Sequence, residues 1–260
     1  MSRLTEKNQS VEKTLQIIET MAENKGPMRL SDISAKVKYP ASTVLRMLNA
    51  LISLGYVKQD AETSRYLLTM KFCRIGELVK SQYSIRDLVR PYLQELSRRC
   101  QESSCLAVED DMTVVYIDVV DGPDKILKTL QRIGKIAPMH CTGVGKLLLL
   151  NYSEEQLEFF AEQKGLLKLT DNTITTLEAL KKELEKIRMQ GYALDNEECE
   201  IGARCVAAPI RDYTGKIVAC ISISGPVSRI TMEKVQNVKE IIIDISQRAS
   251  KELGFIGQQG

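Results

Sequence analysis

A histidine and several cysteines are the residues of this chain best suited to covalent chemistry. His140 is followed directly by Cys141, and Cys199 and Cys205 come later in the sequence. A cysteine with a histidine base is the arrangement of a cysteine-dependent hydrolase, in which Cys141 or Cys205 would be the nucleophile. Because the chain has one histidine and no C-x-x-C spacing, the sequence excludes sites that need two histidines and does not support structural zinc. We expect buried, inert thiols, and the hydrolase remains an alternative.

A glycine-rich segment that suits anion binding follows the histidine. Gly143, Val144, Gly145 and Lys146 resemble part of a phosphate loop. The full pattern requires a glycine where His140 stands and a hydroxyl residue after Lys146, so nucleotide hydrolysis is not expected. Backbone N–H groups at the start of a helix bind small anions without any such consensus. The segment therefore predicts a site for a small anion.

An acidic run at residues 195–198 is a further candidate for a ligand-binding site. It reads Asp-Asn-Glu-Glu, and runs of this kind ordinarily form solvated loops. A role of Asp195 in ligand binding is the alternative.

Hydroxyl, amide and guanidinium side chains occur together near the N-terminus in a pattern that suits DNA. Ser42, Thr43, Arg46 and Asn49 lie on the polar side of a helix predicted by the apolar positions 44, 48, 51 and 52. Such groups contact phosphates or base edges, and an arginine can donate two parallel bonds to guanine. Arg65 begins the second strand of a predicted hairpin, where it would reach a phosphate. These residues predict a DNA-binding surface.

The elements that position this surface are those of a winged helix-turn-helix. Apolar spacings of three and four predict one helix over residues 10–21, with Ser10 as N-cap, and another over 30–37, beginning at Ser31 or Asp32. A third helix follows Pro40 and ends at Gly55, and a hairpin covers residues 56–68. A connecting helix over 69–83 carries apolar residues that another subunit would cover.

The remainder of the chain predicts an α+β domain with an antiparallel sheet. We expect helices over 85–100, from the glycine-rich segment through 150, from capping boxes that begin at Ser153 and Thr175, and over 231–253. Strands are expected over 105–109, 113–120, 126–130, 203–210 and 216–224. A parallel, dinucleotide-binding sheet is not expected.

Composition and charge restrict the class of protein further. Of 260 residues, 43% are hydrophobic and 27% charged, and no apolar run is long enough to span a bilayer. A polar N-terminus and seven scattered cysteines predict a soluble, cytoplasmic protein with reduced thiols and no membrane contact. Residues 1–80 hold 13 Lys and Arg against 8 Asp and Glu, whereas residues 81–260 hold 23 against 26. This asymmetry indicates that only the first module contacts a polyanion.

In their order and spacing, these segments resemble the IclR family of bacterial transcription regulators. The resemblance runs from residue 10 to the last helix and is carried by the stretches SVEKTLQIIETMAE, PASTVLRMLNALISLGYV, RYLLTMKFCRIGE, APMHCTGVGKLLL, IRMQGYALDNEE, IGARCVAAPIRDYTG and ISISGPVSRIT. The motifs of the second half are diagnostic, whereas the first half alone would suit many winged-helix families. The chain departs from relatives at Leu45, where a polar aromatic residue is frequent, and at the polar Thr129.

The resemblance implies an α+β chain with a winged helix-turn-helix DNA-binding domain over residues 1–69, a linker helix over 70–83 and an effector-binding domain over 84–260. The effector domain is expected to have a GAF or profilin-like fold with a curved antiparallel sheet. Such regulators form homodimers or dimers of dimers on palindromic operators in double-stranded DNA, and small organic acids are frequent effectors. No cofactor is implied.

The resemblance also implies an effector pocket. In relatives that bind short keto acids, the pocket residues match these positions of the present sequence: Gly143, Val144, Asp195, Cys205, Ser222 and Ser224, with candidate walls at Ile126, Thr129, Ala137 and Ala203. Backbone N–H groups of the glycine segment and the serine hydroxyls suit a carboxylate. An ionised Asp195 would repel that carboxylate, so it would accept a bond from a ligand hydroxyl, or act protonated or through water.

We therefore expect a DNA-binding transcription regulator, a repressor controlled by a small organic or sugar acid. Two alternatives stay open. The cysteine hydrolase would show a lowered thiol pKa and turnover, and it leaves the basic N-terminal module without a role. A ligand-independent DNA binder would show no response to metabolites.

Overall fold

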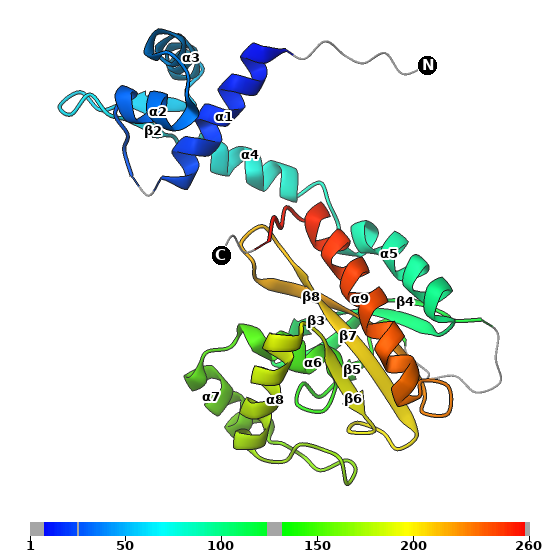
Figure 1. The fold of residues 1–260 in the computed structure, drawn as a ribbon. Coiled ribbons are helices and arrows are strands. Elements are labelled where there is room, and N and C mark those ends of the chain that lie inside the picture. The colour runs from blue at the N-terminus through cyan, green and yellow to red at the C-terminus, as the bar shows by residue number, and fades with distance from the viewer. Residues whose placement is uncertain (1–7, 25, 124–131, 258–260) are drawn as a thin grey trace, which may run out of the picture. The chain divides into compact units, whose positions relative to one another are not determined.

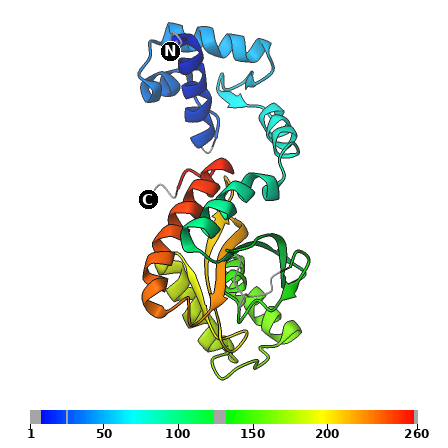
Figure 2. The same ribbon diagram turned by 90° about the vertical axis from the view of Figure 1, so that its right-hand side faces the viewer.

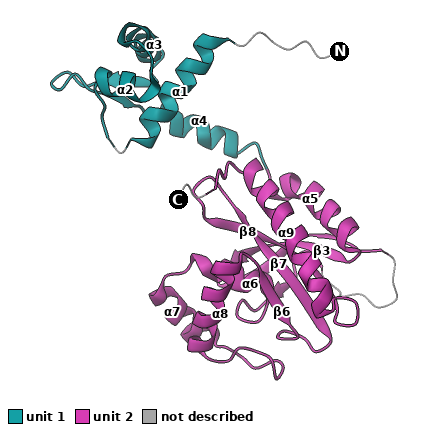
Figure 3. Cartoon of the chain, in the orientation of Figure 1, with its two compact units in different colours: residues 1–83 teal, residues 84–260 magenta. Residues whose placement is uncertain are grey.

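The computed structural model describes residues 8–24, 26–123 and 132–257. The chain divides into two compact units, Met1–Tyr83 and Ser84–Gly260, shown in teal and magenta in Figure 3. Each unit has a hydrophobic core of its own. The strand expected over residues 126–130 lies outside the described residues.

Unit 1 is a winged helix-turn-helix followed by a further helix. It consists of α1 (Gln9–Glu23), α2 (Leu30–Val37), α3 (Ala41–Ser53), β1 (Val57–Gln59), β2 (Tyr66–Leu68) and α4 (Lys71–Lys80) (Figure 1). Strands β1 and β2 pair antiparallel and form the predicted wing. The apolar stripes of the first three helices meet in one core, where Ile17, Ile33, Val44 and Leu48 are fully buried. Helix α4 has no buried residue.

The starts of the first two helices differ from the sequence prediction. Asn8, rather than Ser10, caps α1, because its side-chain oxygen accepts bonds from the backbone N–H groups of Ser10 and Val11. Helix α2 already begins at Leu30. The carboxylate of Asp32 accepts a bond from the backbone N–H of Arg29 at 3.4 Å, so Asp32 stabilises the first turn from within the helix.

Unit 2 is built on one antiparallel sheet in the order β5-β4-β3-β8-β7-β6. Its strands are β3 (Ser103–Asp110), β4 (Thr113–Val120), β5 (Ile136–Ala137), β6 (Ala193–Asn196), β7 (Ala203–Arg211) and β8 (Ile217–Pro226). Its helices are α5 (Ile85–Cys100), α6 (Gly143–Leu148), the 3-10 turn η1 (Leu149–Asn151), α7 (Glu154–Lys164), α8 (Leu177–Gln190) and α9 (Met232–Glu252). The predicted α+β class with an antiparallel sheet is confirmed.

The two faces of the sheet are covered by different helices (Figures 1 and 2). Helices α5 and α9 pack on one face, where they meet residues such as Leu106, Ile221 and Ile223. Helices α6, α7 and α8 belong to the other core, with Cys105 and Ala107 of the sheet. Because side chains alternate along a strand, Ser222 and Ser224 lie on the face opposite to Ile221 and Ile223.

Several boundaries in unit 2 needed correction. The edge strands β5 and β6 were not predicted, because they are short and lack an apolar alternation of their own. The capping box at Ser153 is confirmed by its bonds with Gln156. Helix α8 is capped by Thr176 rather than Thr175, since the Thr176 hydroxyl accepts a bond from the N–H of Ala179.

In the described ranges, no helix combines the length and the apolar character that crossing a membrane requires.

Candidate functional site

A cavity of about 630 Å³ lies on the face of the unit 2 sheet that carries the serines. Strands β4 to β8 and the loop that joins β6 to β7 contribute to its wall. Five residues expected at an effector pocket line it, namely Asp195, Cys205, Ser224, Ala137 and Ala203. Ile126 and Thr129, expected as walls, lie outside the described residues.

Three further residues expected at the pocket, Gly143, Val144 and Ser222, are not among those that line the cavity. Ser222 neighbours Ala207 of β7 and Cys105 of β3 in the sheet, next to the pair formed by Cys205 and Ser224. The hydroxyl oxygen of Ser222 is buried and has no hydrogen-bond partner. Among the described residues, every other buried side-chain nitrogen or oxygen has one. A buried hydroxyl of this kind is costly unless something pairs with it.

The glycine-rich segment is shaped by close packing. The hydroxyl of Thr142 caps α6 by accepting a bond from the N–H of Gly145 at 3.2 Å and donates to the carbonyl of Pro138 at 2.7 Å. A Cβ atom on Gly145 would overlap the backbone of Met139. The glycines therefore hold the start of α6 against its neighbours.

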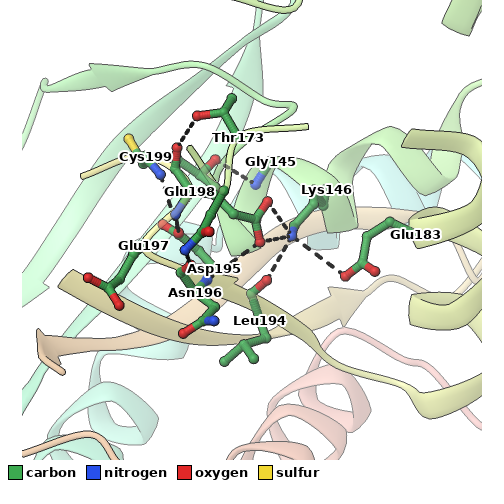
Figure 4. Close-up of polar contacts among 12 residues, drawn as sticks. Gly145, Lys146, Thr173, Glu183, Leu194, Asp195, Asn196, Glu197, Glu198 and Cys199 are labelled. Atoms are coloured by element: carbon green, nitrogen blue, oxygen red, sulfur yellow. Dashed lines mark hydrogen bonds and ion pairs between the residues drawn. The ribbon is translucent and has the colours of Figure 1, made fainter. Parts of the chain in front are cut away.

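Lys146 turns inward and pairs with the acidic run (Figure 4). Its ammonium group donates to both carboxylate oxygens of Glu198, at 2.6 and 2.8 Å, and to the carbonyl of Leu194 at 2.7 Å. The carboxylate of Glu183 lies 3.6 Å away. Lys146 is fully buried, so it needs these partners to offset the loss of hydration. It is therefore not available to a phosphate.

The expectation of a solvated acidic loop is wrong for Asp195 and Glu198, both of which are buried. Lys146 draws Glu198 inward, and the hydroxyls of Thr170 and Thr173 fasten the adjoining backbone by donating to the carbonyls of Glu197 and Glu198. These partners come from segments distant in the sequence, so the run itself does not show them.

Asp195 faces the cavity, and the pKa of its carboxyl group is unusually high. One of its carboxylate oxygens accepts bonds from the backbone N–H groups of Glu198, at 2.8 Å, and Cys199, at 3.4 Å. Burial raises the pKa of Asp195 from 3.8 to about 7, and the charge of Glu198 adds to the rise. The carboxyl group is thus divided between its acid and base forms near neutral pH. It can accept a hydrogen bond from a ligand or donate one.

Several lining residues were missed by the sequence reasoning, among them Tyr116, Lys135, Thr142, Cys199 and Arg204. Tyr116 is 4% exposed, and in the described part of the chain its hydroxyl makes no hydrogen bond. Burial raises the pKa of that hydroxyl, which stays protonated and able to donate. Strand alternation in β4 gave a signal for Tyr116, whereas nothing in the sequence singled out Lys135.

The surroundings of the residues considered for cysteine hydrolysis do not favour a reactive thiolate. His140 Nε2 lies 3.1 Å from the carbonyl oxygen of Leu167, and burial lowers the pKa of the ring. Burial raises the pKa of Cys205 to about 12, and that of Cys141 is raised by its contact with the Cys199 thiol as well as by burial. A protonated thiol is a poor nucleophile. The expected burial holds for Cys141, but Cys199 and Cys205 are only half-buried because they face the cavity.

In unit 1, the residues expected to contact DNA are available for binding. Ser42, Arg46 and Asn49 of α3 are exposed, and Thr43, next to Ser42, is half-buried. Arg65 is half-buried directly before β2. Within the ranges described, none of these five side chains makes a hydrogen bond or ion pair.

Two family descriptions match the chain. The IclR helix-turn-helix domain matches residues 10–61, and the bacterial transcriptional regulator IclR C-terminal domain matches residues 78–251. Together they span both units.

Individual proteins are similar over nearly the whole length. The HTH-type transcriptional regulator XynR of Escherichia coli K12 is 34% identical over 247 residues, covering 95% of this chain and 98% of XynR. The HTH-type transcriptional repressor AllR of Salmonella typhi is 30% identical over 247 residues, covering 95% of this chain and 90% of AllR. The crystal structure of the Thermotoga maritima IclR matches with a TM-score of 0.63 and 32% identity, covering 95% of this chain and 99% of that one.

Proposed function

Because the chain belongs to the IclR family and is a DNA-binding transcriptional regulator, we propose that it is a repressor controlled by a small organic or sugar acid in the unit 2 cavity. The family consists of transcription regulators rather than enzymes. Repression is proposed from the similarity to AllR, which is named a repressor.

The observation that carries the effector proposal is the polar lining of the cavity. Its volume of about 630 Å³ falls in the range of small-molecule sites. Ser224, Tyr116 and Lys135 offer two hydroxyls and an ammonium group, which suit the carboxylate of a small acid. Gly143, Val144 and Ser222, expected as further donors, are not among the lining residues.

The state of Asp195 favours acids with an additional oxygen. A ligand hydroxyl would donate to the ionised form of Asp195, and a keto oxygen would accept from its protonated form. A plain aliphatic acid offers only its carboxylate, which an ionised Asp195 repels. The proposed effectors are therefore hydroxy acids, keto acids and sugar acids.

For operator binding, we propose that α3 enters the major groove with Ser42, Thr43, Arg46 and Asn49, and that Arg65 contacts a phosphate from the wing. The availability of these side chains supports this assignment. A single recognition helix covers only a half-site, so a homodimer or a dimer of dimers on a palindromic operator follows.

A thermal-shift screen of small carboxylic and sugar acids tests the proposal. A ligand that stabilises the protein should then be titrated by calorimetry into wild type, Asp195→Ala, Ser224→Ala and, as a control on the exposed face of α8, Glu185→Gln. We expect the first two variants to lose affinity and the control to retain it. Unchanged affinity in both pocket variants would show that the ligand binds elsewhere.

The bound ligand should also change operator affinity. A coupling of about 1 to 3 kcal/mol is typical, and DNA must then change effector affinity by the same factor. A ligand that occupies the cavity without any effect on operator binding would favour the ligand-independent DNA binder.

A further inference from the structure

The recognition helix α3 and the helix α4 of unit 1 are tied together where α3 ends and α4 begins. Helix α4 leads away from the winged helix-turn-helix and has no buried residue, so no hydrophobic core holds it (Figures 1 and 2). Within the described part of unit 1, the hydrogen bonds that join α4 to the preceding elements start from Lys71 and from Thr69, two residues before it. The orientation of α4 relative to α3 therefore depends on a few groups.

Lys71 places a cation at the carboxyl end of α3. Its ammonium group donates a hydrogen bond to the carbonyl of Leu54, the C-cap of α3, at 2.7 Å. The same group lies over the ring of Tyr56, 4.2 Å from its centroid. The last carbonyls of a helix lack partners within the helix and carry partial negative charge, so a cation there makes a charge-assisted bond. Lys71 thus closes the end of α3 from the first turn of α4.

Further contacts hold the same junction. The hydroxyl of Thr69 donates to the carbonyl of Gly55 at 2.7 Å and accepts a bond from the backbone N–H of Lys71 at 3.3 Å. The backbone N–H of Thr69 donates to the carbonyl of Tyr56 at 2.9 Å. The ring of Phe72 packs against that of Tyr56, with the ring centroids 5.1 Å apart. Side chains and backbone on both sides of the wing thus fasten the start of α4 to the end of α3.

We name this junction the α3–α4 clamp, and its residues are Leu54, Gly55, Tyr56, Thr69, Lys71 and Phe72. We propose that Lys71 is a positioning residue for operator binding, because it fixes α3 to α4 through the clamp and makes the two helices move as one body. The chain enters unit 2 shortly after α4, so α4 connects each recognition helix to the rest of its subunit. In a two-fold assembly, a fixed angle between α3 and α4 restricts the separation of the two recognition helices. This step rests on the homodimer proposed above.

The clamp should make operator binding strict about the spacing of the half-sites. One base pair inserted between them turns the second half-site by about 35° around the DNA axis and moves it by about 3.4 Å. Recognition helices that are fixed to α4 cannot follow this displacement. A loosened clamp would let them follow it, but the pair would no longer be preorganised for the correct spacing.

A direct contact of Lys71 with a phosphate predicts a different result. Its loss would weaken binding to every duplex alike and lower the slope of affinity against salt, because fewer counterions are released. The dependence on half-site spacing would then stay as it is in wild type. Spacing and salt dependence therefore separate the two roles.

The test uses the full chain as wild type, Lys71→Met, Lys71→Arg and Thr69→Val, with Lys80→Met as a control at the other, exposed end of the same helix. An operator is first selected with wild type from random duplexes. Each protein is then titrated by fluorescence anisotropy, at several salt concentrations, against one half-site, the selected operator, and operators with one or two inserted base pairs. Sedimentation velocity and circular dichroism establish the oligomeric state and the folding of each variant before its binding is scored.

We expect Lys71→Met to bind the single half-site as wild type does and to bind the selected operator about tenfold more weakly, because the linkage of the two half-sites is less effective. Its loss on the operators with inserted base pairs should be smaller, so its preference for the selected spacing falls. Thr69→Val, which removes a hydroxyl of the clamp, should behave in the same way. Lys71→Arg should bind as wild type does, since a guanidinium can donate to the same carbonyl and stack on Tyr56. Lys80→Met should also match wild type.

An unchanged preference for the selected spacing in folded Lys71→Met and Thr69→Val would overturn the proposal. An equal loss of Lys71→Met on half-site and operator, with a lower slope of affinity against salt, would also overturn it and make Lys71 a phosphate contact. Both results would leave the proposed homodimer in place. A wild-type protein that selects no two-fold sequence, or stays a monomer on DNA, would refute the homodimer and the spacing proposal with it.

Discussion

The pKa of Asp195 is raised although the ammonium group of Lys146 lies nearby. The ammonium group of Lys146 donates to Glu198 and Leu194 in all three of its hydrogen bonds, so it has none left for Asp195. Burial therefore dominates the titration of Asp195. Two residues of one short acidic run thus have different roles, since Glu198 holds the loop and Asp195 faces the cavity.

Asp195 should make the stability of the protein depend on pH. Its pKa is about 7 in the folded protein, against 3.8 for the ordinary side chain. Between these values the native state holds a proton that the unfolded chain has lost, so the free energy of unfolding falls as pH rises from about 4 to about 7. Asp195→Asn should remove this loss, which amounts to at most about 4 kcal/mol.

Urea unfolding of wild type and Asp195→Asn at pH 5 and pH 8 measures the effect. The stability of the variant relative to wild type should be greater at pH 8, and Glu185→Gln on the exposed face of α8 should show no such change. An equal difference at both pH values would mean that Asp195 titrates normally.

Lys146 should be essential for the stability of unit 2 although it does not line the cavity. Lys146→Met would leave Glu198 buried without its cation, and breaking a buried pair in this way costs about 3 to 5 kcal/mol. Adding Glu198→Gln should recover part of the loss, because the uncompensated charge is then gone. Lys164→Met, which breaks a surface pair with Asp111, should cost no more than about 1 kcal/mol. Chemical denaturation of the four proteins tests this, and a Lys146→Met variant as stable as Lys164→Met would contradict it.

At the scale of elements, the recognition helix and the wing of unit 1 should contribute differently to operator binding. Arg46 on α3 is exposed and unpaired among the described residues, so it can reach a base edge. Arg46→Ala should cost about 1 to 3 kcal/mol on the operator if it reads a guanine. Arg65→Ala should weaken binding to all sequences alike and lower the slope of affinity against salt, because a phosphate contact releases a counterion.

Fluorescence anisotropy with an operator fragment and an unrelated duplex, each at several salt concentrations, separates the two effects. Arg188 is an exposed arginine of α8, so Arg188→Ala serves as the matched control. It should change neither the operator affinity nor the slope of affinity against salt. Operator affinity that both Arg46→Ala and Arg65→Ala leave intact would refute the proposed DNA surface.

At the scale of the whole molecule, local patterns were sufficient for most of the fold. The stripe of α3 and the alternation in β4 are set by neighbours in the sequence, and both elements were predicted. The burial of Glu198 was missed because its cation, Lys146, lies far away in the sequence and donates to Glu198 only in the folded unit. The family resemblance supplied several of the pocket positions, whereas Lys135 required the structure.

The apolar face of α4 should determine the assembly of the protein. Ile75, Leu78 and Val79 are spaced by three and four residues, so they share one side of the helix, and all three are exposed. In the proposed two-fold assembly on a palindromic operator, a second subunit would bury this side. Leu78→Asp would place a charge in that interface, whereas Lys80→Glu changes a charge on the opposite side of the same helix.

Sedimentation velocity at micromolar concentration should show an oligomer for wild type and Lys80→Glu and a smaller species for Leu78→Asp. Because two half-sites bound together gain affinity from their linkage, Leu78→Asp should also lose operator affinity by more than it loses affinity for a single half-site. A wild-type chain that sediments as a monomer both free and on DNA would refute the proposed assembly. An oligomer that persists in Leu78→Asp would place the interface on another surface.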